Sequence, residues 1–144
     1  MVRRIGIKQM AQTHRSLMIK FNQQHRAVDV LMLAAPGGEA TRQMVTAEVL
    51  TALGPQGTLI NIGRGSLVDE TALVSALVEG RLGAAGLDVF NDLANPPAAL
   101  FALENVVLSQ HRGSATVESR AAMRDLFVAN VQAFFAGKAP LTPV

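Results

Sequence analysis

Residues 57–90 constrain the fold of this 144-residue chain most, because they read as strand, turn, helix and strand. A β-branched and apolar run from Thr58 to Ile62 lies between two glycines, which is typical of a strand buried on both faces. After a turn at Gly63-Arg64-Gly65, apolar residues recur at helical spacing until a glycine, and Asp69 can cap that helix. A second strand is predicted from Ala84 to Val89.

A strand–helix–strand unit of this kind closes with a right-handed crossover, which makes its two strands parallel. Further strands are predicted over residues 28–34 and 106–109, and a short helix over residues 98–103. We therefore expect an α/β fold with a parallel sheet flanked by helices. In such sheets ligands bind outside the carboxyl ends of the strands, which lie at one edge.

Four residues of interest lie at or shortly after the carboxyl ends of the predicted strands: Pro36, Arg64, Asp88 and His111. Singly, such residues are more often surface charges, turn residues or incidental histidines. Their joint position at one edge favours a site. Arginine can grip a carboxylate through two hydrogen bonds, and histidine can donate a proton to a carbonyl oxygen while hydride arrives at the carbon. Reduction of a 2-keto acid needs both functions.

Four motifs also carry a resemblance to a known family: Leu33-Ala-Ala-Pro-Gly-Gly38, Asn61-Ile-Gly-Arg-Gly-Ser-Leu-Val-Asp69, Ala85-Gly-Leu-Asp-Val-Phe90 and His111-Arg-Gly-Ser-Ala-Thr116. In this order they resemble the D-isomer-specific 2-hydroxyacid dehydrogenases, and within that family most of all the glyoxylate and hydroxypyruvate reductases. The resemblance covers residues 28–144. It implies an incomplete Rossmann-type domain that binds NADP or NAD and reduces a small 2-keto acid to the 2-hydroxy acid.

The resemblance also implies roles for individual residues. Arg64 would bind the substrate carboxylate and His111 would donate the proton. Near the adenosine part of the cofactor would lie Ala34, Ala35 and Pro36. Around the nicotinamide would lie Ile62, Asp88, Gly113 and Ser114.

The first 26 residues carry six basic side chains and no acidic one, whereas the rest of the chain has seven basic and eleven acidic residues. Such a segment could target a mitochondrion or bind nucleic acid nonspecifically. We favour a third interpretation, in which Arg4-Ile5-Gly6 resembles the end of a phosphate-binding loop and the stretch to Phe21 resembles the helix and strand that follow it. Met1 and Arg3 then stand in place of the first two glycines, which bring backbone close to the pyrophosphate.

The predicted domains are therefore a basic segment over residues 1–27, as a degenerate remnant of the phosphate-loop helix and second strand, and the C-terminal part of an NAD(P)-binding domain over residues 28–144. His25 and Arg26 weakly favour NADP, because basic residues there can bind a ribose 2′-phosphate, or they are loop residues. The separate substrate domain and an internal unit of the family are not found in the chain.

Two departures concern the candidate proton donor. The family usually has a glutamate five residues beyond the aspartate, where this chain has Leu93, and the neighbouring Asp92 is the candidate substitute. Without an acidic partner His111 is harder to protonate near neutral pH, and Arg112 beside it adds to that effect. A catalytically impaired nucleotide-binding remnant, either a pseudoenzyme or a truncated product, is thus the alternative to an active oxidoreductase.

Composition narrows the remaining classes of function. The chain has no Cys, which excludes disulfides and suits a cytoplasmic protein, and three dispersed His residues offer no metal-ligand spacing. The absence of Trp and Tyr leaves few stacking platforms for nucleic acid, and no apolar run reaches the length of about 20 residues that spans a bilayer.

A long C-terminal helix is predicted, capped by Ser114 or Thr116 and ending before Gly137. Its apolar stripe includes Phe127, Phe134 and Phe135. These rings either lie exposed, which favours self-association such as a homodimer, or pack on the sheet of the same domain.

Overall fold

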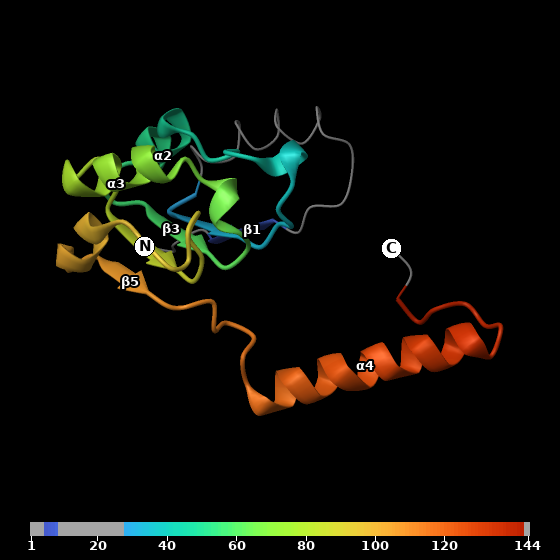
Figure 1. Cartoon of the computed structure of the whole chain (residues 1–144). Coiled ribbons are helices and arrows are strands. Elements are labelled where there is room, and N and C mark those ends of the chain that lie inside the picture. The colour runs from blue at the N-terminus through green and yellow to red at the C-terminus, as the bar shows by residue number, and fades with distance from the viewer. Residues whose placement is uncertain (1–4, 9–27, 143–144) are drawn as a thin grey trace. The chain divides into compact units, whose positions relative to one another are not determined.

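A parallel sheet of five strands is the centre of the described structure. The computed structural model describes residues 28–142 and the backbone of residues 5–8 (Figure 1). The strands are β1 (Ile5–Lys8), β2 (Val30–Leu33), β3 (Thr58–Asn61), β4 (Ala84–Leu87) and β5 (Val106–Leu108). Each strand pairs in parallel with the next one along the chain, so the order in the sheet is the order in the sequence. The predicted α/β parallel sheet is confirmed.

Burial alternates along the strands, so the prediction that the central strand is buried on both faces is wrong for the described residues. In β3, Leu59 and Asn61 are buried, whereas Thr58 and Ile60 are only half-buried. The strands β2 and β4 show the same alternation. The physical reason is that α2 (Ala47–Leu53) and α3 (Glu70–Val78) pack against one face of the sheet.

The core lies between that face and the two helices, which contact each other and lie side by side in Figure 1. The helices contribute Val49, Leu50, Leu53, Leu73, Ala76 and Leu77 to it, and the strands contribute Leu31, Leu33, Leu59, Ala85 and Leu87. Within residues 28–142, three short 3-10 helices complete the connections: η2 (Glu39–Thr41), η3 (Gly65–Leu67) and η4 (Ala98–Ala102).

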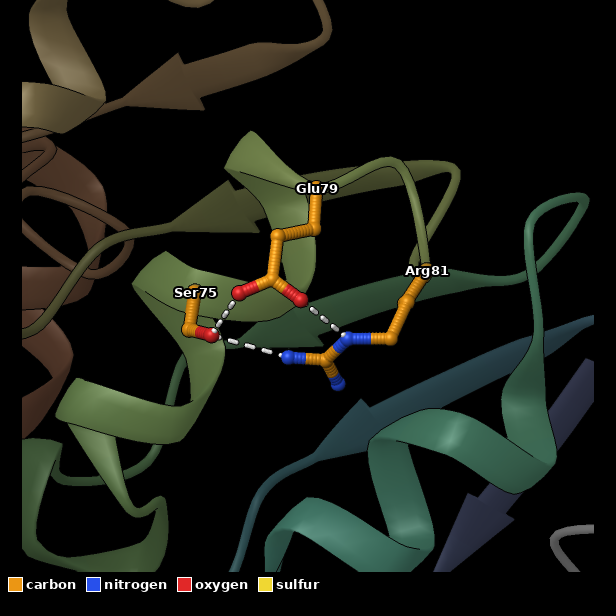
Figure 2. Close-up of polar contacts among 3 residues, drawn as sticks. All are labelled: Ser75, Glu79 and Arg81. Carbon is orange, nitrogen blue, oxygen red and sulfur yellow. Dashed lines mark hydrogen bonds and ion pairs between the residues drawn. The ribbon is translucent and has the colours of Figure 1, made fainter.

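Helix α3 forms as its sequence predicts. The Asp69 carboxylate accepts a hydrogen bond of 3.0 Å from the Ala72 N–H, which satisfies one of the free donors of the first turn. Figure 2 shows the other end, where Ser75, Glu79 and Arg81 bond to one another at 2.6 to 2.8 Å. The Arg81 guanidinium, followed by the Ser75 hydroxyl, lowers the pKa of Glu79. This cluster ties the end of α3 to the turn that enters β4, at the edge of the sheet away from the strands' carboxyl ends.

The chain divides into two compact units, residues 1–111 and residues 112–144. The second unit contains the predicted C-terminal helix, α4 (Val117–Phe135), with Thr116 as its cap: the Ser119 N–H donates to the Thr116 hydroxyl at 3.1 Å. After Gly137 the chain returns to the helix, where the Asn130 side chain accepts from the Leu141 N–H at 2.7 Å. No residue of α4 is buried, and Phe127, Phe134 and Phe135 are 69%, 68% and 82% exposed.

At the start of the chain the structure differs from the prediction. We expected residues 4–6 to end a phosphate-binding loop and a helix to follow, but residues 5–8 form β1, paired with β2. A short stretch beside an existing strand gains backbone hydrogen bonds to that strand, which the local sequence does not reveal. The rest of the predicted segment, residues 1–4 and 9–27, lies outside the described residues. None of the described helices is both long enough and apolar enough to cross a membrane.

Candidate active site at the carboxyl edge of the sheet

The strands end in register, which brings the segments after them together. Leu33, Asn61, Leu87 and Leu108 are paired across the sheet in one row. Beyond this row the backbone continues to bond across: the Ile62 N–H to the Leu33 carbonyl at 3.1 Å, the Asp88 N–H to the Asn61 carbonyl at 3.0 Å, and the His111 N–H to the Asp88 carbonyl at 2.8 Å. The backbone of three predicted site residues is thereby held at one edge.

The loops that follow β2, β3 and β4 also touch one another. A Cβ added to Gly37 would lie 2.9 Å from the Arg64 Cγ, and one added to Gly63 would lie 2.7 Å from the Ala35 carbonyl oxygen. At Gly65 the approach is closer still, since an added Cβ would lie 2.1 Å from the carbonyl carbon and oxygen of Phe90. Glycine permits these close approaches because it has no Cβ.

Arg64 lies where the loops after β2 and β3 meet. Its backbone is extended, and its Nη1 donates to the Gly63 carbonyl at 2.7 Å, while the aliphatic stem lies against Gly37. The side chain is exposed. A guanidinium in this position has donors left over for a carboxylate, which it can bind in a two-pronged geometry.

His111 follows β5 in an unusual backbone conformation. Its φ is 55°, in the left-handed region, which costs a residue with a Cβ about 1 to 2 kcal/mol. The hydrogen bond from its N–H to Asp88 helps to hold that conformation. The side chain is exposed, so the imidazole is accessible for proton transfer.

Asp92 does not take the place of the missing glutamate. Its two carboxylate oxygens accept hydrogen bonds within its own loop, from the Asn95 side chain at 2.8 Å and from the Ala94 N–H at 2.9 Å. The Asn95 bond is the main cause that lowers the pKa of Asp92. The prediction that Asp92 replaces the family's glutamate beside His111 therefore finds no support, because the Asp92 carboxylate is already bonded within its own turn. Leu93 is 50% exposed.

The predicted cofactor-binding residues differ in what they present. Ile62 is 47% exposed, which makes it an apolar surface at the carboxyl edge. Asp88 is buried, with an exposed fraction of 7%. Ala34 and Pro36 are exposed, but the Ala35 side chain belongs to the core, so only its backbone is available. Gly113 and Ser114 fall in the second unit, and their place at the site stays a prediction.

A cavity of about 340 Å³ opens beside this edge, between the loop after β4 and the end of β5. Its lining is mainly apolar and comprises Phe90, Leu93, Ala94, Pro96, Phe101, Leu108, Ser109 and Gln110. The last of these precedes His111 directly.

Asn61 is a buried polar residue of this region for which the sequence alone indicates no role. Its side chain is 1% exposed, its Nδ2 donates to the Arg64 carbonyl at 2.9 Å, and its Oδ1 accepts from the Gly63 N–H at 3.1 Å. The sequence feature that could have drawn attention to Asn61 is its position, as a polar residue at the end of a largely apolar strand.

An open parallel sheet with loops gathered at its carboxyl edge is the architecture of ligand-binding α/β domains, including nucleotide-binding domains of the Rossmann type. Residues 3–113 match the family described as "D-isomer specific 2-hydroxyacid dehydrogenase, NAD binding domain". The chain belongs to this family, as its motifs suggested.

Relatives and solved structures agree with that assignment. The chain is 59% identical over 116 residues to a hydroxyphenylpyruvate reductase of Plectranthus scutellarioides. It is 57% identical over 116 residues to a glyoxylate/hydroxypyruvate reductase of Arabidopsis thaliana. Each match covers 81% of this chain and 37% of the relative. An NADPH-dependent glyoxylate/hydroxypyruvate reductase from Sinorhizobium meliloti, solved with NADP and malonate, superposes with a TM-score of 0.81 at 50% identity, over 86% of this chain and 39% of that one. The chain thus spans well under half the length of these proteins.

Proposed function

We propose that this chain is the cofactor-binding part of an oxidoreductase that reduces a small 2-keto acid, of the glyoxylate or hydroxypyruvate type, with NADPH or NADH. One observation carries the proposal: Ile62, Asp88 and His111 are tied to one edge of the sheet by consecutive backbone hydrogen bonds, with Arg64 in the adjoining turn. Malonate and NADP in the Sinorhizobium meliloti structure are consistent with a carboxylate ligand and a nicotinamide cofactor for this chain.

The described residues fit the nicotinamide end of such a cofactor. A nicotinamide needs an apolar surface for its ring and a polar partner for its carboxamide, and the half-exposed Ile62 lies next to the mostly buried Asp88. The loop of Ala34, Ala35 and Pro36 would lie along the adenosine part, and Gly113 and Ser114 near the nicotinamide. When bound, the cofactor supplies hydride.

Two side chains would act on the keto acid. Arg64 would bind the carboxylate through paired hydrogen bonds and so orient the neighbouring carbonyl group. His111 would donate a proton from its imidazole to the carbonyl oxygen as negative charge develops there, which is the role of a general acid. Both side chains are exposed at the edge, where a small ligand can reach them.

A second candidate function is cofactor binding without turnover. The observation that favours it is the loop after β4, where Leu93 stands in the place of the family's glutamate and Asp92 is bonded to Ala94 and Asn95. A general acid is usually held in place by a neighbouring partner, and the Asp92 carboxylate is already bonded within its own loop. This alternative keeps the nucleotide site and loses the general acid.

A fluorescence titration of the purified chain with NADPH and NADH tests the proposal, since no Trp or Tyr obscures the nicotinamide signal. We expect saturable binding, followed by measurable reduction of glyoxylate or hydroxypyruvate. The variant Arg64→Gln should weaken carboxylate binding by about 10- to 100-fold and leave cofactor binding unchanged. Arg81→Gln, at the opposite edge, is the matched control. A folded chain that binds neither cofactor contradicts the proposal, and binding without turnover supports the second candidate.

The cellular setting is proposed on composition alone. A chain without Cys fits the reducing cytoplasm. A homodimer through the exposed phenylalanines of α4 is proposed as its state of assembly.

A further inference from the structure

The Asn61 carboxamide bonds to two backbone groups of the turn that carries Arg64. Its Oδ1 accepts from the Gly63 N–H at 3.1 Å and its Nδ2 donates to the Arg64 carbonyl at 2.9 Å. The backbone carbonyl of Asn61 also accepts from the Asp88 N–H at 3.0 Å. Asn61 is therefore bonded both to the turn after β3, which carries Arg64, and to the residue that follows β4, Asp88.

This bridge is buried, which makes its geometry demanding. Among the described residues, Asn61 and Asp88 are the buried polar or charged ones, and Asn61 is only 1% exposed. A buried amide needs both a donor and an acceptor for its polar atoms, because an unsatisfied one costs free energy. Asparagine offers one of each on a short side chain, whereas aspartate offers acceptors and leucine offers neither.

We propose that Asn61 is the positioning residue for Arg64: it holds the turn of residues 62–64 so that the guanidinium faces a bound carboxylate. Asn61 acts through Arg64 and does not itself touch the ligand. The Arg64 stem against Gly37 and its bond to the Gly63 carbonyl fix the side chain on that turn. Movement of the turn would therefore displace the donors that meet the carboxylate. This inference rests on the proposed function, in which Arg64 binds the substrate.

The variant Asn61→Asp tests the inference with almost no change in shape. It keeps the acceptor for Gly63, removes the donor to Arg64 and introduces a carboxylate whose charge also acts on a bound anion, which the test on the natural chain described below avoids. The matched control is Asn105→Asp, because the Asn105 side chain makes the same kind of bond, 2.8 Å to the Gly83 carbonyl, at the opposite edge of the sheet. The full chain, labelled with ¹⁵N, is titrated with malonate as an unreactive carboxylate probe in the presence of saturating NADPH.

We expect Asn61→Asp to bind malonate about tenfold more weakly, with NADPH affinity within about twofold of the natural chain, and to change the Arg64 Nε–H signal. Asn105→Asp should leave all three unchanged. If Asn61 only stabilised the fold, the variant would bind both malonate and NADPH more weakly. A folded Asn61→Asp chain that binds malonate as well as the natural chain overturns the inference.

The natural chain supplies a second test that does not depend on the variant folding. Malonate should shift the Arg64 Nε–H, the Gly63 N–H and the Asn61 side-chain amide together, and leave the Asn105 side-chain amide in place. A shift of Arg64 without Asn61 and Gly63 overturns the inference and leaves the proposed function standing. If malonate does not bind, or binds equally to Arg64→Gln, the carboxylate role of Arg64 fails, and the inference fails with it.

Discussion

Replacement of Gly65 by alanine should destabilise the chain and separate the loops that form the candidate site. The added Cβ would lie 2.1 Å from the Phe90 carbonyl carbon and oxygen and 2.4 Å from the Asn91 nitrogen. Ordinary carbon contacts are about 3.5 to 4.0 Å, so one of the two loops must move by more than about 1 Å. These neighbours are backbone atoms, which cannot turn aside as a flexible side chain can.

Overpacking of this size typically costs about 1 to 3 kcal/mol of unfolding free energy. For a chain of this length that corresponds to a fall in Tm of roughly 3 to 10 °C. Because Gly65 follows Arg64 directly, the displacement should also weaken malonate binding. Thermal unfolding followed by circular dichroism, with a malonate titration at 15 °C below the lower Tm, measures both effects.

The matched control is Gly86→Ala in strand β4. A Cβ there would meet the Ile60 Cγ1 at 3.9 Å, which is an ordinary contact, so the Tm should stay the same or rise slightly. If Gly65→Ala is as stable as Gly86→Ala and binds malonate normally, the argument that these loops are held together by close contact is refuted.

Three further outcomes are expected. His111→Gly should raise the unfolding free energy by up to about 1 kcal/mol, because glycine accepts the φ of 55° without strain. The same variant should abolish keto acid reduction, and unchanged turnover would rule out the proton-donor role. The pKa of Asp92, followed by NMR, should lie below its ordinary value of 3.8 and return toward it in Asn95→Ala. The bonds of that carboxylate are present above its ordinary pKa and are lost as the pH falls through the lowered one, so the loop should loosen only at acid pH. Phe134→Ser with Phe135→Ser should reduce self-association measured by light scattering, since both rings are exposed, and an unchanged mass would refute a role for these rings.

The sequence predicted the parts of the fold whose signals are local. The run from Thr58 to Asn61, the Asp69 cap and the helical spacing of α3 each depend on a few neighbouring residues, and all are found. The carboxyl edge followed from the handedness of the strand–helix–strand unit. The seven-residue helix α2 was missed, because a segment so short gives little periodic signal.

Features that depend on distant parts of the chain were less predictable. The strand β1 forms by pairing with β2, and burial on one face depends on where α2 and α3 pack. The bridge made by Asn61 needs the exact path of a turn, and the bonding of Asp92 to Asn95 needs the conformation of a loop. Such hydrogen bonds are set by three-dimensional geometry that residue spacing does not specify.

The most direct test of the central claim is to map the NADPH site on the full ¹⁵N-labelled chain by amide chemical shifts. We expect the shifts to concentrate at Ile62, Asp88 and His111, which the backbone bonds hold at the carboxyl edge, and to spare Leu82 and Asn105 at the opposite edge. Shifts that cluster away from the carboxyl edge, or no shifts in a folded chain, would contradict the claim that this edge is a nicotinamide and keto acid site.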